Sequence, residues 1–504
     1  MEDNDLEEKP DVECHEELSS KTQLSKTRNG VVLIPQPSDD PRDPLNWPQR
    51  KKYLALFVFS LSAFGGTSSS LVNQLGFKAQ ADLYDKTLVE MSYSISAAIA
   101  GLAYGPLFFV PLAEKYGRSS LIFWTLVGNV ARGNYIPFVI SRLFTGMFGA
   151  CPSILGTGMI TDIFFLHERG KAFSTFSLSF LFGTLAGPTF GGFIVEHVSW
   201  QVEFWWTIGF QVLVIILVFC FIEETGFTRG AGRIYPPLSS SFTKNRIDTF
   251  FPGSKVVPNA SWADVGNIAM IPIMIGITPV VLLTGFFNFI SFGWFVMINT
   301  LLTVFLEEPL GDGGYHFTPQ QNAAFTFALW IGVMAAQVCG FLLNDRIPLW
   351  IAKRRGGTWK PEYRLHSLWL PGLVLLPIGL AIFGAALQLH LHYMVLALGS
   401  FIITFSTMQT IPVAVNYVVE CFELHPTQVG TIMGCYRLTL GLAIPFFVDA
   451  WMSAVSGPGW VFGMAGFFSI FGFLLIILLI WKGHWLRQFS FARLAVDEEG
   501  LRVF

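Results

Sequence analysis

Five charged side chains lie within or at the ends of long apolar segments of this 504-residue chain, and they are its first candidates for chemistry. Three are the carboxylates Asp162, Glu420 and Asp449. A carboxylate whose pKa changes with burial can bind a proton in one state and release it in another. The alternative for each of the three is an ordinary solvated helix end.

The other two charged side chains are the arginines Arg142 and Arg437. An arginine at the bilayer centre costs about 2.5–3.5 kcal/mol on insertion scales, so Arg142 is expected to face the protein interior. Because it lies near the start of its segment, the alternative is a side chain that snorkels out to the membrane surface. Arg437 lies deeper in its segment, so we expect it to be functional or paired rather than exposed to lipid.

A second pattern combines glycines with a proline. Residues 183–192 place Gly183, Gly187 and Gly191 four residues apart, so they share one face of a helix, and Pro188 interrupts that helix. Small residues in this register let another backbone approach closely, whereas the proline removes one ladder hydrogen bond and bends the helix. The run therefore predicts tight packing and a bend.

A third pattern lies between two apolar segments, where Glu114, Lys115, Gly117 and Arg118 follow one another closely. Gly117 permits a tight turn, and the acid and bases can pair with one another or with helix ends. Taken alone, this is equally well a charged turn on one side of a membrane.

The elements that hold these residues are expected to be membrane helices. The chain is 52% hydrophobic and only 13% charged, whereas soluble domains are about 25% charged. Apolar stretches long enough to cross a bilayer recur along the chain, which predicts an all-α polytopic membrane protein. We place twelve spans at 53–73, 91–112, 119–135, 137–162, 172–195, 204–222, 278–301, 320–343, 367–388, 393–419, 428–453 and 460–481.

The placement of positive charge supports this count and orients the chain. Lysines and arginines gather in alternate loops, most densely in 223–267 and in the loop after the eighth span, which the positive-inside rule places in the cytoplasm. Both termini are then cytoplasmic. Six spans on each side of the long loop predict two six-helix bundles, an arrangement typical of transporters with a midplane site.

The expected domains are a disordered cytoplasmic tail at 1–46, whose start is strongly acidic, and an N-terminal bundle at 47–222. A cytoplasmic linker at 223–267, a C-terminal bundle at 268–481 and a cytoplasmic tail at 482–504 follow. The six cysteines are scattered without a ligand-like spacing, which indicates neither a disulfide framework nor a metal site. The net charge of −3 gives no reason to expect nucleic acid as a partner.

On these residues the chain resembles the major facilitator superfamily, specifically the fungal form of its twelve-span drug:proton antiporter family. Residues 183–192 match the antiporter motif G-x-x-x-G-P-x-x-G-G at every fixed position. The loop at 111–119 is similar to G-x-L-A-D-R-x-G-R-R, with Glu114 for the aspartate and Ser119 for the last arginine. Arg142 and Gly146 match the arginine motif of span 4. Residues 340–346 resemble a degraded second copy of the loop motif.

The resemblance implies a role for each motif. The loop residues Glu114, Lys115, Gly117 and Arg118 would gate the cytoplasmic side, and Arg142 would take part in proton coupling. The glycine motif, completed by Gly192, would mark export rather than uptake. The serine at position 119 in place of the last basic residue puts the strength of the gate in question.

The resemblance also implies that spans 1, 4, 7 and 10 line a central cavity for a small molecule. The polar and aromatic candidates on these spans are Asn73, Asn288, Trp294, Gln409 and Asn416. Most aromatic residues, among fifty phenylalanines, are expected to be ordinary packing. A mostly apolar cavity suits a moderately hydrophobic organic molecule better than a sugar or a phosphate.

The expected function is proton-coupled efflux of a drug, toxin or secreted metabolite by a monomer in the plasma membrane. A vacuolar membrane is the alternative location. No P-loop motif G-x-x-x-x-G-K-[ST] occurs, so the expected driving force is the proton gradient, without a cofactor. Uptake or exchange of a nutrient, cation or polyamine on the same fold stays open, as does a transport-inactive sensor, whereas an enzyme is not expected.

Overall fold

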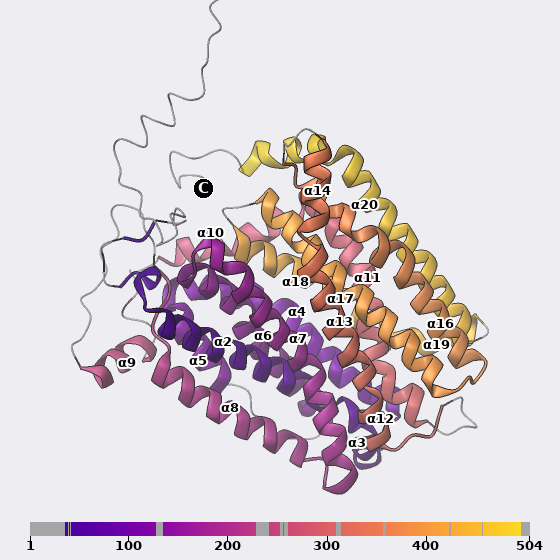
Figure 1. The fold of residues 1–504 in the computed structure, drawn as a ribbon. Coiled ribbons are helices and arrows are strands. Elements are labelled where there is room, and N and C mark those ends of the chain that lie inside the picture. Colours follow the sequence, from indigo (N-terminus) through magenta and orange to yellow (C-terminus); the bar gives the residue numbers. More distant parts are fainter. Residues whose placement is uncertain are drawn as a thin grey trace, which may run out of the picture.

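The computed structural model describes residues 36–38, 40, 42–127, 135–227, 241–251, 256, 261–308, 314–355, 359–422, 425–455 and 457–494. Within these ranges the regular elements are all helical, and Figure 1 shows most of them as long rods lying side by side. Continuous apolar sequence explains this, since a backbone in lipid must satisfy its hydrogen bonds within its own segment.

The first half of the chain contains α2 (Gln49–Leu71), η2 (Val72–Leu75), α3 (Phe77–Tyr84), α4 (Leu88–Tyr116), α5 (Arg118–Val127), α6 (Tyr135–Ile163), α7 (Leu166–His197) and α8 (Val202–Phe221). Between the halves lie α9 (Phe242–Phe250) and α10 (Trp262–Gly276). The second half contains α11 (Pro279–Glu307), α12 (Pro319–Phe325), α13 (Phe327–Leu343), α14 (Arg346–Arg354), α15 (Glu362–Leu365), α16 (Leu376–Gln388), α17 (Tyr393–Cys421), α18 (Pro426–Ala443), η6 (Ile444–Phe446), α19 (Val448–Ala454) and α20 (Pro458–Leu494).

Eleven helical segments of the described chain are long and apolar enough to cross a membrane, and they coincide with eleven of the twelve predicted spans. The remaining predicted span, 119–135, begins with α5, and its residues 128–134 lie outside the described ranges. The tail predicted at 1–46 also lies mostly outside them. The fold is thus an all-α polytopic membrane fold, for which twelve helices are a plausible count.

Several predicted boundaries differ from the structure, including the last, since α20 continues to Leu494 beyond the predicted end at residue 481. Span 11 was expected to run to residue 453, but its membrane segment ends at Phe446 and α19 is a separate short helix. Pro445 has no N–H to continue the helix, which explains the break. Span 7 was expected to end at residue 301, but α11 continues to Glu307.

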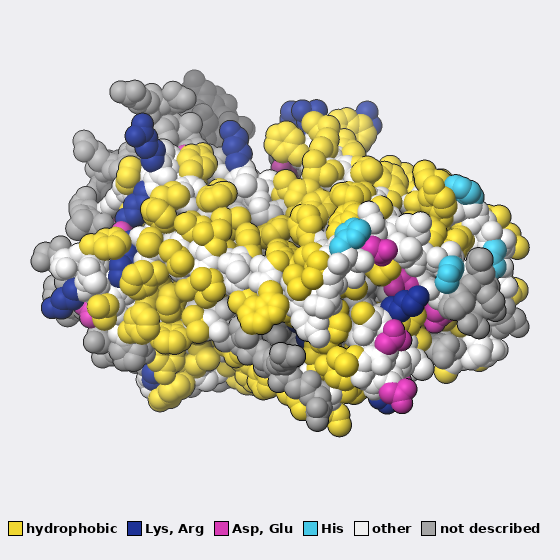
Figure 2. Space-filling view, turned by 90° about the horizontal axis from the view of Figure 1, so that it is seen from below, with side chains coloured by type: hydrophobic (Ala, Val, Ile, Leu, Met, Phe, Trp, Pro, Cys, Tyr) yellow, Lys and Arg dark blue, Asp and Glu magenta, His cyan; other side chains and the backbone are white. Residues whose placement is uncertain are grey.

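The side chains around the helices divide into a lipid-facing set and a core. Large apolar side chains are exposed on the outer helices, for example Phe341, which is 78% exposed, and Trp481, which is 80% exposed. Figure 2 shows hydrophobic side chains over much of one face of the molecule. Such a surface is expected to contact lipid, since a soluble monomer rarely exposes large apolar patches.

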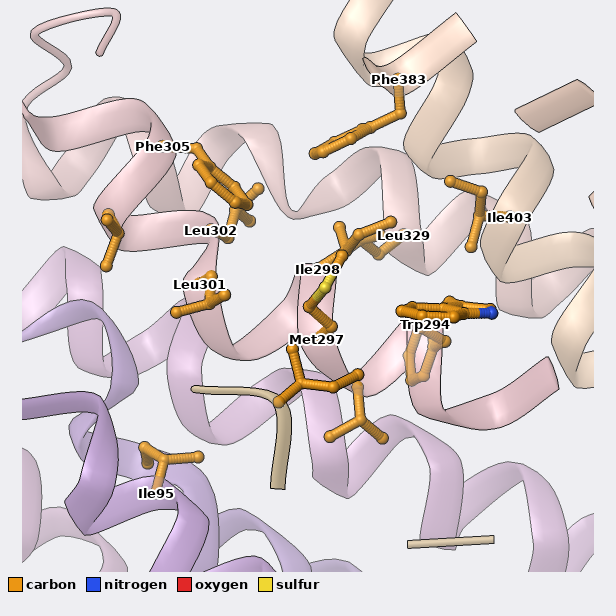
Figure 3. Close-up of a cluster of buried hydrophobic side chains, with 14 of the residues drawn as sticks. Ile95, Trp294, Met297, Ile298, Leu301, Leu302, Phe305, Leu329, Phe383 and Ile403 are labelled. Atoms are coloured by element: carbon orange, nitrogen blue, oxygen red, sulfur yellow. The ribbon is translucent and has the colours of Figure 1, made fainter. Parts of the chain in front are cut away.

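Helix α11 lies at the centre of the core. Of its most apolar window, 94% is buried inside the protein, the largest share among the candidate spans. Figure 3 shows hydrophobic side chains of α11 together with Leu329 of α13, Phe383 of α16 and Ile403 of α17; those labelled on α11 are Trp294, Met297, Ile298, Leu301, Leu302 and Phe305. A helix that is buried on all sides is apolar all round, so its sequence shows no separate polar face.

The two halves contact each other in two regions. Helix α7 packs against α12 and α13, and α4 packs along α18. Helix α10 contacts both α4 and α18, so a segment predicted to begin in the linker touches both halves. Between these regions lies the candidate site.

Candidate functional site

A cavity lies between the two halves, and seven helices line it: α2, α4, α6, α7, α11, α17 and α18. The four spans expected from the resemblance, 1, 4, 7 and 10, are among them, and spans 2, 5 and 11 add to the wall. Most lining side chains are aliphatic or aromatic. The neutral polar ones are Thr67, Ser153, Thr184, Asn299, Thr300 and Thr431, and the charged one is Arg437.

The five residues predicted for the cavity do not line it. Two of them belong to hydrogen-bonded pairs elsewhere. Asn73 donates from Nδ2 to Ser94 Oγ over 2.9 Å, and Gln409 donates from Nε2 to Asn344 Oδ1 over 2.8 Å. The four predicted spans thus contribute to the cavity wall, but the five predicted residues are not part of it.

The other three cavity candidates have different surroundings. The Trp294 ring lies 6.2 Å from that of Trp451 in α19, and Trp294 is not part of the cavity wall. Asn288 is buried, and both polar atoms of its amide lack a hydrogen-bond partner within the described structure. Asn416 is exposed. Asn299 and Met408, from the same two helices α11 and α17, line the cavity instead.

Arg437 of α18 is the cationic side chain of the cavity wall. Its guanidinium lies over two rings, 4.9 Å from the centroid of Phe292 and 5.8 Å from that of Phe180. No carboxylate of the described residues forms an ion pair with it, and its buried Nε has no hydrogen-bond partner there. Arg437 was expected to be functional or paired. In the described structure its guanidinium contacts aromatic rings rather than a carboxylate.

Arg142 of α6 is buried, with 3% of its surface exposed, so it does not snorkel in this structure. Its Nη2 donates to the carbonyl oxygens of Ser69 and Ser70 over 2.9 and 2.6 Å. These carbonyls lie in the last turn of α2. The guanidinium also lies 5.3 Å from the ring centroid of Phe204. Backbone carbonyls and a ring therefore replace the water that the charge has lost.

Glu203 is a buried carboxylate near Arg142 that sequence reasoning missed. It is 0% exposed, and its Oε1 accepts a hydrogen bond of 2.8 Å from Gln80 Nε2. Its Oε2 has no partner within the described residues. The two buried charges interact electrostatically but do not form a contact ion pair. The predicted span 6 begins at residue 204, so Glu203 falls just outside it, among the residues of the preceding loop.

The glycine motif packs α7 against α2. A Cβ built on Gly183, Gly187 or Gly191 would lie less than 3.0 Å from backbone oxygens of α2 or, for Gly191, of η2. The backbones therefore approach closely at three successive turns, as the spacing predicts. Pro188 lies inside the continuous helix α7, and Gly192 faces Ala323 and Pro319 of α12 in the other half.

Part of this glycine face also leaves room for Glu203. A Cβ on Gly191 would lie 3.4 Å from Glu203 Oε2, and a Cβ on Gly76 would lie 2.8 Å from the same oxygen. Larger side chains at these two positions would meet the carboxylate. The glycine motif therefore lies in direct proximity to the buried Glu203 carboxylate.

The loop motif connects α4 to α5. Gly117 has φ 83°, a backbone conformation that favours glycine, and it ends α4. Arg118 Nη1 pairs with Asp162 Oδ2 at the end of α6, and the Lys115 ammonium lies 3.8 Å from the ring centroid of Trp262 in α10. Glu114 lies in α4, but its side chain is outside the described structure.

Glu224, after α8, binds the start of α5. It accepts hydrogen bonds from the backbone N–H groups of Arg118 and Ser119 over 3.0 and 3.2 Å. A carboxylate satisfies free N–H groups at a helix N-terminus and interacts favourably with its dipole. Removal from water raises the pKa of Glu224, and the hydrogen bonds that it accepts oppose that effect.

A similar arrangement occurs in the second half. Arg364 Nε pairs with Glu420 Oε1 at the end of α17, and its Nη1 lies 3.0 Å from Asp345 Oδ1. Two candidate proton carriers, Asp162 and Glu420, are therefore each held by an arginine in corresponding places of the two halves. The third, Asp449, lies in α19 with its side chain outside the described structure.

The α7–α12 region joins the halves through hydroxyl groups. The Oγ1 atoms of Thr189 and Thr326 lie 2.7 Å apart, and Trp330 Nε1 donates to Thr189 Oγ1 over 3.1 Å. Nearby, Thr303 Oγ1 of α11 donates to the Gln74 carbonyl of η2 over 2.7 Å. These bonds close this end of the interface between the halves.

Comparison with known proteins shows to which family the chain is similar. A family model described as Major Facilitator Superfamily matches residues 53–447. The chain is 27% identical to the MFS transporter cpaT of Aspergillus oryzae over 448 residues, 86% of each chain. It is 27% identical to the efflux pump radE of Floropilus chiversii over 471 residues, 89% of this chain and 84% of that one.

The fold is also similar to solved structures. The proton:xylose symporter XylE bound to 6-bromo-6-deoxy-D-glucose aligns with a TM-score of 0.58 at 16% identity, covering 86% of this chain and 96% of the other. At that identity the likeness concerns the fold alone.

Proposed function

Because the chain belongs to the Major Facilitator Superfamily and is a membrane transporter rather than an enzyme, we propose that it exports a moderately hydrophobic organic molecule in exchange for protons. Support for export comes from the glycine motif and from relatives named efflux pumps. The mostly apolar cavity between the halves supports an organic substrate.

The buried Glu203 beside Arg142 is the observation that carries proton coupling. A fully buried carboxylate with a single hydrogen bond is costly as an anion, so protonation or pairing with a cation stabilises it. We assign the exchanged proton to Glu203. When Glu203 releases it, Arg142 can neutralise the carboxylate, and the carbonyls of Ser69 and Ser70 would then lose a donor.

This coupling would connect to transport through α2. Arg142 binds the end of α2, and α2 packs on the glycine face of α7, which contacts α12 of the other half. A change in the Arg142 contacts would therefore be transmitted to the interface between the halves. The other two candidates, Asp162 and Glu420, are better suited to gating, since each is already paired with an arginine.

The driving force is sufficient. One proton moving down 100 mV supplies about 2.3 kcal/mol and one pH unit adds about 1.4 kcal/mol. Together they would hold a neutral substrate at a roughly 500-fold concentration gradient. We further propose the plasma membrane as the location, with both termini in the cytoplasm, from the distribution of lysine and arginine.

The test uses everted membrane vesicles from yeast that expresses the full chain, with neutral, anionic and cationic apolar dyes as probes. An acidic lumen should drive accumulation of at least one dye. Glu203→Gln should abolish that gradient-driven accumulation while exchange of dye against dye continues, because exchange requires no net proton movement.

Glu90→Gln is the matched control, since Glu90 is a partly exposed carboxylate at the start of α4 and away from Arg142. It should behave as the unmodified protein does. Gradient-driven accumulation by the Glu203→Gln variant would remove Glu203 as the proton carrier. Dye movement opposite to the export direction would instead favour uptake.

A further inference from the structure

The cavity wall combines one positively charged side chain, Arg437, with aromatic rings. Of the described residues that line the cavity, Arg437 alone carries a charge, and the remainder are apolar or neutral polar side chains. Phe180 from the first half and Phe292 from the second lie beside its guanidinium. The positive charge is therefore placed where both halves meet.

This charge lacks an anionic partner in the described structure. Other arginines of the described structure do pair with carboxylates, for example Arg118 with Asp162, Arg364 with Glu420 and Arg487 with Glu362. The Arg437 Nε atom is buried without a hydrogen-bond partner. Arg437 is partly buried, and a cation withdrawn from water without an anion is costly, so the site gains most from a ligand that supplies negative charge.

We infer that this cavity binds an aromatic organic anion, with Arg437 holding its carboxylate, sulfonate or phenolate and the neighbouring rings packing against its aromatic part. Guanidinium groups bind such oxyanions through short, charge-assisted hydrogen bonds. The neutral side chains Asn299 and Thr431 add hydrogen-bonding capacity in the same wall without competing for the charge.

This inference rests on the proposed function and narrows its substrate class. It also agrees with the energetics of export. Moving an anion out while a proton moves in transfers two charges in the direction that a negative-inside potential favours. A cationic substrate would be repelled by Arg437 and would gain nothing from the potential in a one-for-one exchange.

The test is equilibrium binding to the purified full-length protein without any gradient, measured by isothermal titration calorimetry. Naphthalene-2-sulfonate is the anionic probe and naphthalene-2-sulfonamide is its neutral counterpart with the same ring system. The unmodified protein should bind the sulfonate about tenfold or more tightly than the sulfonamide. Arg437→Gln should abolish that preference, and Arg437→Lys should retain part of it.

Arg354→Gln is the matched control. Arg354 also packs on an aromatic ring, 3.9 Å from the centroid of Trp350, but it lies outside the cavity. It should leave the preference for the sulfonate unchanged. Size-exclusion chromatography and circular dichroism of each variant establish that it is folded.

Equal binding of the two probes to the unmodified protein, no binding of either, or an unchanged preference in Arg437→Gln would overturn the inference. Each of these results leaves the proposed proton coupling intact, because coupling is tested separately through Glu203 under a gradient. Conversely, the unmodified protein could show no proton-driven dye accumulation and still prefer the sulfonate. That result would contradict the proposed function but not the inference that the cavity binds an aromatic anion.

Discussion

Gly187 of α7 lies against the backbone carbonyl of Ser68 in α2, so close that a Cβ at position 187 would have no room. The contact is backbone to backbone, which side-chain rearrangement cannot relieve. Ser68 strengthens it, since its Oγ donates to the Gly183 carbonyl over 3.0 Å. The glycine motif is thus a fixed contact between two helices that both line the cavity.

We predict that Gly187→Leu abolishes transport. The substitution must push α2 and α7 apart, at a cost of several kcal/mol by comparison with overpacked cores, where about 1–3 kcal/mol is typical for side-chain clashes alone. Dye accumulation in vesicles and thermal stability in detergent measure the effect. Gly209→Leu is the control, because a Cβ at Gly209 meets nothing within 4 Å. Normal export by Gly187→Leu would show that close packing at this position is dispensable.

Arg142→Ala is expected to uncouple transport from pH. The substitution removes the donor to the Ser69 and Ser70 carbonyls and also removes the positive charge near Glu203. Glu203 should then remain protonated in all states, since no cation stabilises its anion. Accumulation should therefore become independent of the imposed pH gradient. A mutant with a normal pH dependence would mean that Arg142 is purely structural.

The arginine–carboxylate pairs of the two halves should contribute separately to stability. We expect double-mutant cycles of Arg118→Gln with Asp162→Asn, and of Arg364→Gln with Glu420→Gln, to give coupling energies of about 1 kcal/mol each. Thermal unfolding in detergent measures them. A cross-cycle of Arg118→Gln with Glu420→Gln should give no coupling, because the two residues belong to different pairs. Substantial coupling in the cross-cycle would contradict independent pairs.

Thr189→Val should open the α7–α12 end of the interface. It removes the hydrogen bonds with Thr326 and Trp330, each worth about 1 kcal/mol, so the closed form should lose a factor of about 30 in population. Maleimide labelling of Ala323→Cys, in a chain with its native cysteines replaced, should become faster.

Thr175→Val is the control for this change, since Thr175 of the same helix bonds to its own Lys171 carbonyl. It should leave the labelling rate unchanged. If Thr189→Val labels no faster than this control, the two hydroxyl contacts do not hold the halves together.

The sequence by itself determined the membrane helices and the packing role of the glycines. Apolar stretches of this length have no other way to satisfy their backbone in lipid, and glycines four residues apart must share a helix face. The sequence also predicted the turn at Gly117, because a turn depends on residues close to one another in the chain. These features depend on the order of residues along the chain.

Which polar side chains face the cavity was decided only by the tertiary structure. Helix α11 is buried on nearly all sides, so its sequence contains no polar face that would separate Asn299, which lines the cavity, from Asn288, which does not. Glu203 and Arg142 are distant in sequence and come near each other only because α6 and α8 both pack on α2. The sequence shows that Arg437 is a charge within an apolar segment. Only the packing of the two halves shows that it faces a cavity without an anionic partner among the described residues.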